Sequence, residues 1–195
     1  MKKVLFVLVA FALAGCGRTV ERIDTNKVVD LSGYWNDTDS RLVAEEMVKD
    51  CLNRPWLAGF TAVNKRQPVV IVGDVLNRSS EHIDSLLFTK DLERELTNSG
   101  LVRFVASSEE RMEVRAERVD QKENAESSTI KPKGHETGSD YMLKGTVNSV
   151  KDQIKGKYVV LYQVNLELID MANNQKVWIG QKEIKKFVQS GKIKF

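Results

Sequence analysis

The apolar positions of this chain follow helical spacing in its first half and strand-like alternation in its second half. The first helical stripe consists of Leu42, Val43, Met47, Val48, Cys51 and Leu52. Asp37 or Asp39 is a natural N-cap before this stripe, because a carboxylate accepts hydrogen bonds from the first free backbone N–H groups. Pro55 is expected to end the helix. A metal ion bound by Asp37 and Asp39 is the alternative, but two carboxylates in one loop are weak evidence for a metal site.

Two further helices are predicted between residues 84 and 124. The stripe of the first consists of Phe88, Leu92 and Leu96, widened by Leu87. Gly100 follows this helix where a C′ residue belongs. Ser107 and Glu110 fit a capping box before the second helix. That helix is mostly charged, and its thin stripe consists of Met112, Ala116 and Val119. A solvated helix and a partner surface both fit this pattern, and the solvated helix is favoured.

The sequence also predicts strands before, between and after these two helices. Residues 68–73 form a continuous apolar run, which predicts a central strand covered on both faces, with a loop at 77–80. Residues 101–106 predict a short second strand, and an exposed loop is expected at 124–138.

Three longer strands are predicted at 141–150, 158–169 and 176–186, with turns at 152–157 and 172–175. The middle strand alternates, and its apolar face consists of Val160, Tyr162, Val164, Leu166 and Leu168. Asn174 suits the positive φ of a tight turn. The expected fold class is therefore α/β, a mixed, mostly antiparallel sheet flanked by helices.

The N-terminus has the order of a bacterial lipoprotein signal. Lys2 and Lys3 precede an eleven-residue run without polar side chains. This length suits a signal peptide and falls short of the roughly 20 residues that a spanning helix needs. The run ends in Leu-Ala-Gly before Cys16, which resembles a lipobox, so residues 1–15 are expected to be cleaved and Cys16 to be lipidated. An ordinary signal peptide with a chance cysteine, or a short buried helix, is the alternative.

The residues after the cysteine define the expected organisation. Gly17 follows Cys16 where lipoproteins of the inner membrane typically carry aspartate, so the lipoprotein resemblance implies the outer membrane, on the periplasmic side. Residues 16–30 are expected to be a lipidated tether, and the fourteen residues after the cysteine reach at most roughly 45–50 Å. Residues 31–195 are expected to form one domain.

Charge and cysteine content exclude several classes of protein. Removing residues 1–15, with Lys2 and Lys3, leaves 28 of the 30 basic residues against 27 acidic ones. This balance gives no reason to expect nucleic-acid binding. With Cys16 lipidated, Cys51 has no disulfide partner, and it is expected to be a buried thiol rather than a reactive one. No nucleophile, phosphate-binding, dinucleotide or metal motif is present, so we expect a binding protein without cofactor or metal, not an enzyme.

Five segments resemble the LpoB family. They are DLSGYWNDTDSRLVAEEM (30–47), RQPVVIVGDVLNRSSEHID (66–84), FTKDLERELTNSG (88–100), GSDYMLKGTV (138–147) and VNLELIDMANNQKVWIG (164–180). The resemblance implies an outer-membrane lipoprotein that activates a bifunctional class A penicillin-binding protein, a peptidoglycan synthase. It also implies a monomeric soluble domain similar to the N-terminal domain of TolB. Enterobacterial members carry a long Pro-rich tether, and this chain departs from that pattern.

The loops around residues 35–41 and 77–80 are the predicted docking face, because they are polar, lie at element ends and fall within the family-like segments. Arg41 and Arg78 can make bidentate contacts, and Trp35 can provide an aromatic anchor. Trp35 as a core residue is the alternative, and it is favoured. The rival function is an outer-membrane assembly lipoprotein of the curli-secretion type. A monomeric domain favours the activator, and a ring favours the assembly role.

Overall fold

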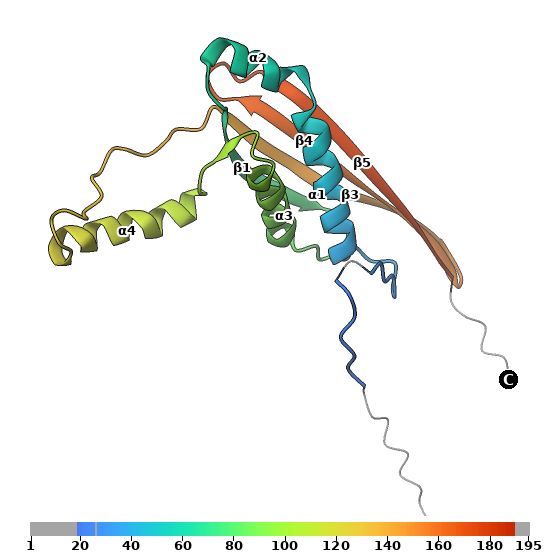
Figure 1. Cartoon of the computed structure of the whole chain (residues 1–195). Coiled ribbons are helices and arrows are strands. Elements are labelled where there is room, and N and C mark those ends of the chain that lie inside the picture. Colours follow the sequence, from blue (N-terminus) through green and yellow to red (C-terminus); the bar gives the residue numbers. More distant parts are fainter. Residues whose placement is uncertain (1–18, 26, 190–195) are drawn as a thin grey trace, which may run out of the picture.

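The computed structural model describes residues 19–25 and 27–189, which are built on one curled, mixed, five-stranded sheet (Figure 1). The strands are β1 (Val69–Arg78), β2 (Arg103–Phe104), β3 (Tyr141–Ile154), β4 (Lys157–Asp170) and β5 (Lys176–Gln189). Their order is β2-β1-β3-β4-β5, with β1 parallel to both neighbours and the β3–β4 and β4–β5 pairs antiparallel. The two longest ladders are the antiparallel ones, so the predicted mixed α/β class is confirmed.

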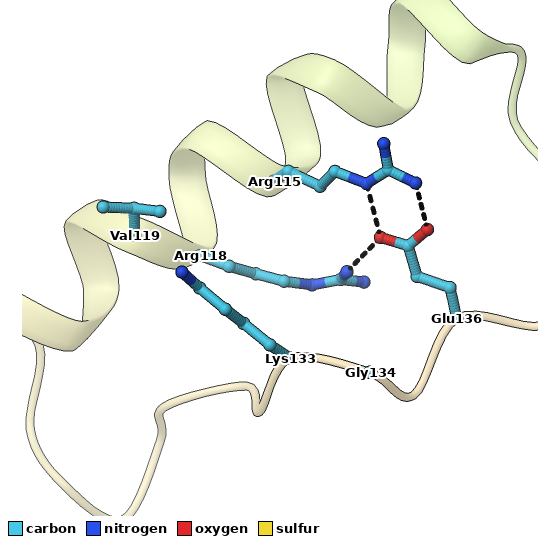
Figure 2. Close-up of a pocket in the computed structure, with 6 residues that line it drawn as sticks. All are labelled: Arg115, Arg118, Val119, Lys133, Gly134 and Glu136. Carbon is cyan, nitrogen blue, oxygen red and sulfur yellow. Dashed lines mark hydrogen bonds and ion pairs between the residues drawn. The ribbon is translucent and has the colours of Figure 1, made fainter.

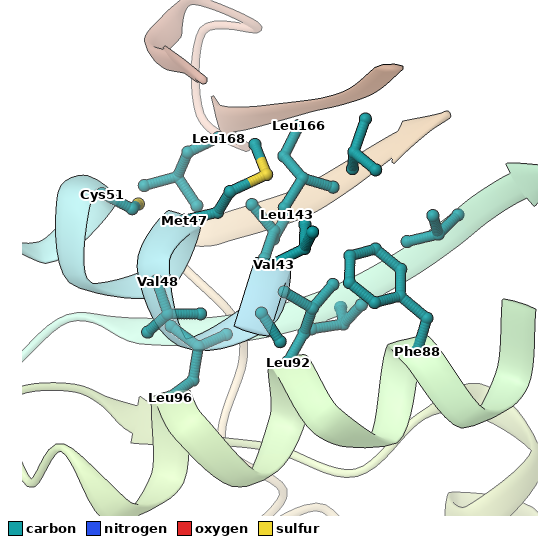
Figure 3. Close-up of a cluster of buried hydrophobic side chains, with 14 of the residues drawn as sticks. Val43, Met47, Val48, Cys51, Phe88, Leu92, Leu96, Leu143, Leu166 and Leu168 are labelled. Carbon is teal, nitrogen blue, oxygen red and sulfur yellow. The ribbon is translucent and has the colours of Figure 1, made fainter. Parts of the chain in front are cut away.

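Four helices accompany the sheet within the described residues, namely α1 (Asp37–Leu52), α2 (Pro55–Asn64), α3 (Ser85–Asn98) and α4 (Ser108–Asn124). Helices α1 and α3 lie side by side and bury their apolar sides against one face of the sheet (Figures 1 and 3). The predicted stripe of α3 is confirmed, since Phe88, Leu92 and Leu96 are all buried.

Two leucines assigned to these stripes are exposed instead. Leu42 is 44% exposed and Leu87 is 48% exposed. Each residue along a helix is rotated by about 100° from the previous one, so a position directly before the buried row points to the side of the stripe. Ala44 takes the place expected for Leu42 and is fully buried.

The boundaries of α1 correct two predictions. Its N-cap is Asn36, not Asp37 or Asp39: the Asn36 side chain accepts a hydrogen bond from Asp39 N, and the Asp39 carboxylate accepts one from Asn36 N. Asp39 therefore completes a capping box from the third helical position. The helix ends at Leu52, and Pro55 begins α2 because its fixed φ suits the first helical position. Helix α2 was absent from the sequence prediction.

Strand β1 is longer than its apolar run. Residues 69–72 are buried, as expected for a covered strand, but the strand continues through a register shift between Val72 and Val75. Asn77 and Arg78, predicted to lie in a loop, pair with Val147 and Asn148 of β3. Parallel pairing with β3 extends β1 because ladder hydrogen bonds do not require apolar side chains.

The long hairpins follow the prediction closely. The five apolar positions of β4 from Val160 to Leu168 are buried, which confirms the alternation. Asn174 has φ 62°, as the turn requires, and Gly156 with φ 78° lies in the other turn. That turn is shorter than the predicted 152–157, because β3 extends to Ile154 and β4 begins at Lys157.

Helix α4 projects away from the sheet (Figure 1). Its capping box is confirmed, with the Ser107 side chain accepting from Glu110 N and the Glu110 carboxylate accepting from Ser107 N. None of its residues is buried, and Met112 from the thin stripe is 61% exposed. The helix is therefore largely exposed to solvent, and the loop 125–140 returns from it to β3, with Glu136 of the loop paired to Arg115 and Arg118 of the helix.

Candidate functional site

Trp35 lies against the core in the segment before α1. Its ring meets the rings of Phe88 and Tyr162 edge-on, with centroid distances of 6.1 and 5.5 Å. The indole Nε1 donates a hydrogen bond of 2.7 Å to Oγ of Ser40, which is buried. The structure thus places much of this ring in contact with the core.

Glu81 brings the two predicted docking segments together. Its Oε2 accepts hydrogen bonds from the Tyr162 hydroxyl at 2.6 Å and from Trp35 N at 3.4 Å. Burial, with this carboxylate beside the phenol, raises the pKa of Tyr162. The segments around residues 35–41 and 77–80 therefore lie at the same end of the domain, as a docking face built from both requires.

The two predicted arginines differ in their surroundings. Arg41 forms an ion pair with Glu45 one turn along α1, with 3.2 Å between Nη1 and Oε1, and its side chain is 25% exposed. Arg78 lies exposed at the end of β1, and its side chain has no hydrogen-bond or ion-pair partner within the described ranges. Arg78 is therefore the arginine whose guanidinium is available to a partner.

Lys186 of β5 fastens the segment before α1 to the sheet. Its Nζ donates to Asp30 Oδ1 and Asp39 Oδ2, both at 2.6 Å, and to the Tyr34 carbonyl at 3.1 Å. Burial opposes the charge of Lys186, but the hydrogen bonds to both carboxylates outweigh it and raise the pKa of the amine. The carboxylates of Asp30 and Asp39 thus hold the largely buried ammonium group of Lys186.

Two tyrosines of β4 complete this attachment. The Tyr158 hydroxyl donates to the Ser32 carbonyl, and the Tyr162 hydroxyl lies 3.2 Å from the Gly33 carbonyl. Gly33 has φ 76°, and a Cβ there would lie 2.2 Å from Val188 Cγ2. Only glycine fits this close approach, so the segment follows one path over the sheet.

A cationic pocket lies between α4 and the following loop (Figure 2). Glu136 accepts two hydrogen bonds from Arg115, at 2.9 and 2.7 Å, and one from Arg118 at 2.9 Å. The Arg115 guanidinium, with Arg118, lowers the pKa of the Glu136 carboxyl to about 2. Lys133 also lines this cavity of about 410 Å³. The two arginines hold the Glu136 carboxylate, whereas the Lys133 amine points away from it, toward Val119 (Figure 2).

Cys51 lies within the core. It is 2% exposed, and burial raises the pKa of its thiol to about 12. The prediction of a buried thiol is confirmed. The lipid-attachment residue Cys16 and the signal at 1–15 lie outside the described residues.

Across residues 19–25 and 27–189, no group of three or more histidine, cysteine, aspartate or glutamate side chains could hold a metal ion. Asp39 is engaged by Lys186 and by the Asn36 backbone, so the metal interpretation of Asp37 and Asp39 loses its support. No helix in the described part of the chain is both long and apolar enough to cross a membrane.

Sequence reasoning missed three features of these surfaces. Helix α2 had a signal, a proline followed by nine residues without charge. The contacts of Lys186 with Asp39 and of Glu81 with Tyr162 had none, because 147 and 81 residues separate the partners.

These observations place the described residues in the class of α/β domains with one mixed sheet. Their surface includes both charged and apolar side chains. A family model described as "Peptidoglycan-synthase activator LpoB" matches residues 39–184. The match covers most of the chain, so the chain belongs to the LpoB family.

Several solved structures are similar to this chain. The LpoB C-terminal domain from Escherichia coli has 16% identity and a TM-score of 0.45, covering 75% of this chain and 98% of that one. The NMR structure of E. coli LpoB has 12% identity and a TM-score of 0.45, covering 97% and 90%. Lipoprotein GNA1162 from Neisseria meningitidis has 18% identity and a TM-score of 0.36, covering 63% and 84%. A search of curated proteins finds no match.

Proposed function

We propose that this chain is an outer-membrane lipoprotein that binds and activates a bifunctional class A penicillin-binding protein, and so regulates peptidoglycan synthesis. The observation that carries the proposal is the family match over residues 39–184, because that family is described as a peptidoglycan-synthase activator. The protein acts through contact with the synthase, without catalytic residues, cofactor or nucleic acid. Its domain works as a monomer, and its fold is related to the N-terminal domain of TolB.

The anchor is the lipidated Cys16, exposed after removal of residues 1–15. Residues 16–30 form the tether, and the domain begins at residue 31. The contacts of Lys186 with Asp30, the last residue of the tether, and of Tyr158 with Ser32 support a boundary next to residue 30, since attachment to the sheet begins there. Anchored in this way, the domain faces the periplasm from the outer membrane.

The docking face at the tether end includes Arg41 and Arg78. The exposure of Arg78 and its lack of a partner among the described residues support a role in binding. Arg41 must exchange Glu45 for a partner carboxylate, which reduces the gain from its contact. Trp35 contributes by holding the segment in place, since its ring packs on Phe88 and Tyr162.

The test is capture of the synthase from native membranes with the full-length protein as bait. We expect a class A penicillin-binding protein to be retained by the parent and less of it by Arg78→Ala. Arg94→Ala is the matched control, since Arg94 is an exposed arginine paired within α3. Retention of no penicillin-binding protein by the folded parent would contradict the proposed function. Equal retention by Arg78→Ala would remove Arg78 from the docking face.

A further inference from the structure

The three long strands of the sheet extend past the end of β1. Arg78, the last residue of β1, pairs with Asn148 of β3, and β3 continues six residues further to Ile154. At about 3.3 Å per residue, this extension measures about 20 Å. We call it the sheet tip, and it consists of residues 150–161, which include the turn between β3 and β4, and residues 185–189 of β5.

The sheet tip lies where the N-terminal segment reaches the domain (Figure 1). The Tyr158 hydroxyl donates to the Ser32 carbonyl, and Lys186 pairs with Asp30. Leu31 lies between these two contacts and is 93% exposed. The fourteen residues between Cys16 and the domain reach at most roughly 45–50 Å. A lipid on Cys16 therefore holds the sheet tip within about that distance of the membrane.

The outer face of the sheet tip, opposite the core, is apolar and uncovered. Val150, Ile154 and Phe187 are 68%, 73% and 63% exposed. Side chains alternate between the two faces of a strand, so these residues lie on the face that α1 and α3 leave open. In the ladders Val150 pairs with Leu161, and Val159 pairs with Phe187. Cross-strand neighbours are in contact, so the five side chains form one patch.

The apolar character of this face is confined to the sheet tip. The next two rows across β3, β4 and β5 are polar, namely Asn148, Gln163 and Glu183, then Thr146, Asn165 and Gln181. From Val150 to Ile154 the patch extends about 13 Å along the strand. A partner that covered the whole face would meet mostly polar side chains. The pattern therefore favours a contact made by the tip alone, to a shallow depth.

The charges around this patch are positive. Lysines at the sheet tip are exposed at positions Lys151, Lys155, Lys157 and Lys185, and none of them has an ion-pair partner among the described residues. Asp152 is the sole acidic residue in the sequence of the tip. Long lysine side chains keep their ammonium groups in water while neighbouring apolar groups leave it. A patch that is apolar at its centre and cationic at its rim complements an anionic lipid surface.

We propose that the sheet tip enters the headgroup region of the membrane that carries the lipid anchor, with its lysines on anionic phospholipids. This inference rests on the lipid anchor of the proposed function. The anchor keeps the tip close to the membrane, so a surface that binds lipid weakly on its own is sufficient. Two copies meeting through their tips would bring like charges together, which opposes a dimer there.

This contact also orients the domain. Membrane-surface segments enter the boundary between headgroups and acyl chains by about 5–10 Å. Arg78 lies about 20 Å behind the end of the sheet tip, by the length of the strand extension. The predicted docking segments thus stay clear of the lipid and remain accessible to the synthase.

The test uses the purified lipidated protein in vesicles of phosphatidylethanolamine and phosphatidylglycerol. Ile154→Cys carries an environment-sensitive fluorophore, and phospholipids with a nitroxide near the headgroup quench it at close range. Ile179→Cys is the matched control, because Ile179 is a 64% exposed isoleucine that pairs with Glu167 on the same face, away from the tip. Cys51 is buried and stays unlabelled.

We expect quenching at residue 154 to be about threefold or more stronger than at residue 179, because the quencher lies at the depth that the tip enters. Val150→Cys is a second reporter, and its quenching should fall between the two, since Val150 lies four residues behind Ile154 on the same face. Circular dichroism establishes that each variant is folded. If one tip variant does not fold, the other decides, because both replace exposed side chains.

Equally weak quenching at residues 154 and 179 would overturn the proposal. Equally strong quenching at both would also overturn it, because the whole face would then lie on the membrane. Quenching at residue 154 that is unchanged in vesicles of phosphatidylcholine alone would overturn the assignment of anionic lipid. A fluorescence change that requires the synthase, or that grows with protein concentration in detergent, would replace the membrane by the synthase or by a second copy.

Failure of this inference is distinguishable from failure of the proposed function. Stimulated glycan polymerisation by the unlabelled protein, with no quenching at residue 154, would overturn this inference alone. Quenching at residue 154 without stimulation would overturn the activator function and leave the membrane contact standing. A purified protein whose mass shows no lipid on Cys16 would overturn the anchor and this inference together.

Discussion

Replacing Trp35 by alanine tests whether this residue belongs to the core. The substitution removes two edge-on ring contacts, with Phe88 and Tyr162, and the hydrogen bond to Ser40. It leaves the Ser40 hydroxyl, which is 2% exposed, without its indole donor. The segment before α1 also loses its ring contact with the sheet, which is made to Tyr162 of β4.

The magnitude follows from these contacts. A fully buried tryptophan replaced by alanine costs about 3–5 kcal/mol, and edge-on ring pairs contribute about 0.5–1.5 kcal/mol each. Trp35 is only partly buried, so we expect Trp35→Ala to lower the free energy of unfolding by about 2–4 kcal/mol. Trp35→Phe keeps a ring and loses the indole donor, so its cost should be about 1–2 kcal/mol.

The assay is urea unfolding followed by far-ultraviolet circular dichroism, which does not depend on the removed tryptophan. Tyr34→Ala is the matched control, because the neighbouring tyrosine is 53% exposed and its side chain has no hydrogen bond in the described structure. The control should stay within about 0.5 kcal/mol of the parent, as for surface substitutions. If Trp35→Ala also stays within that range, the core assignment is wrong and Trp35 returns as a docking candidate.

Three further predictions concern other parts of the chain. Cys51 should react with a bulky maleimide far more slowly in folded than in unfolded protein, and Cys51→Ala should cost about 1–2 kcal/mol in urea unfolding. The Glu136 carboxyl has its pKa lowered from 4.5 to about 2, so its attachment to Arg115 should persist above pH 4.5 and be lost as the pH falls toward 2. Amide protection in the loop, taken relative to the intrinsic exchange rate at each pH, should fall over that range in the parent and should already be low at neutral pH in Glu136→Gln; equal protection in both proteins at neutral pH refutes this. Cys16→Ser should block lipidation. Mass spectrometry of the mature parent should find Cys16 as its first residue, and a mature protein that starts at another residue would show that the assignment is wrong.

The sequence predicted those elements whose pattern repeats locally. The α3 stripe and the alternation of β4 are examples, because burial of one face imposes a period of about 3.6 or 2 residues that is readable in a short window. The capping box of α4 was predicted for the same reason, since its two partners are three residues apart.

Features decided by competition or by distant contacts were not predictable in this way. Asn36, Asp37 and Asp39 are all good caps, and only the path of the preceding segment selects Asn36. A proline is compatible with the end of one helix and with the first position of another, so Pro55 alone did not indicate whether a second helix follows. The contacts that join the two predicted docking segments run through Glu81 and Tyr162, on elements far apart in the sequence, so no local pattern indicates them.

Activation of a peptidoglycan synthase is measured as an increase in the rate of glycan polymerisation. A purified class A penicillin-binding protein is supplied with lipid-linked disaccharide precursor, with and without the purified full-length protein. We predict a polymerisation rate that rises with protein concentration and reaches a plateau as the synthase becomes saturated. An unchanged rate at every concentration, with circular dichroism showing a folded protein, would contradict the account.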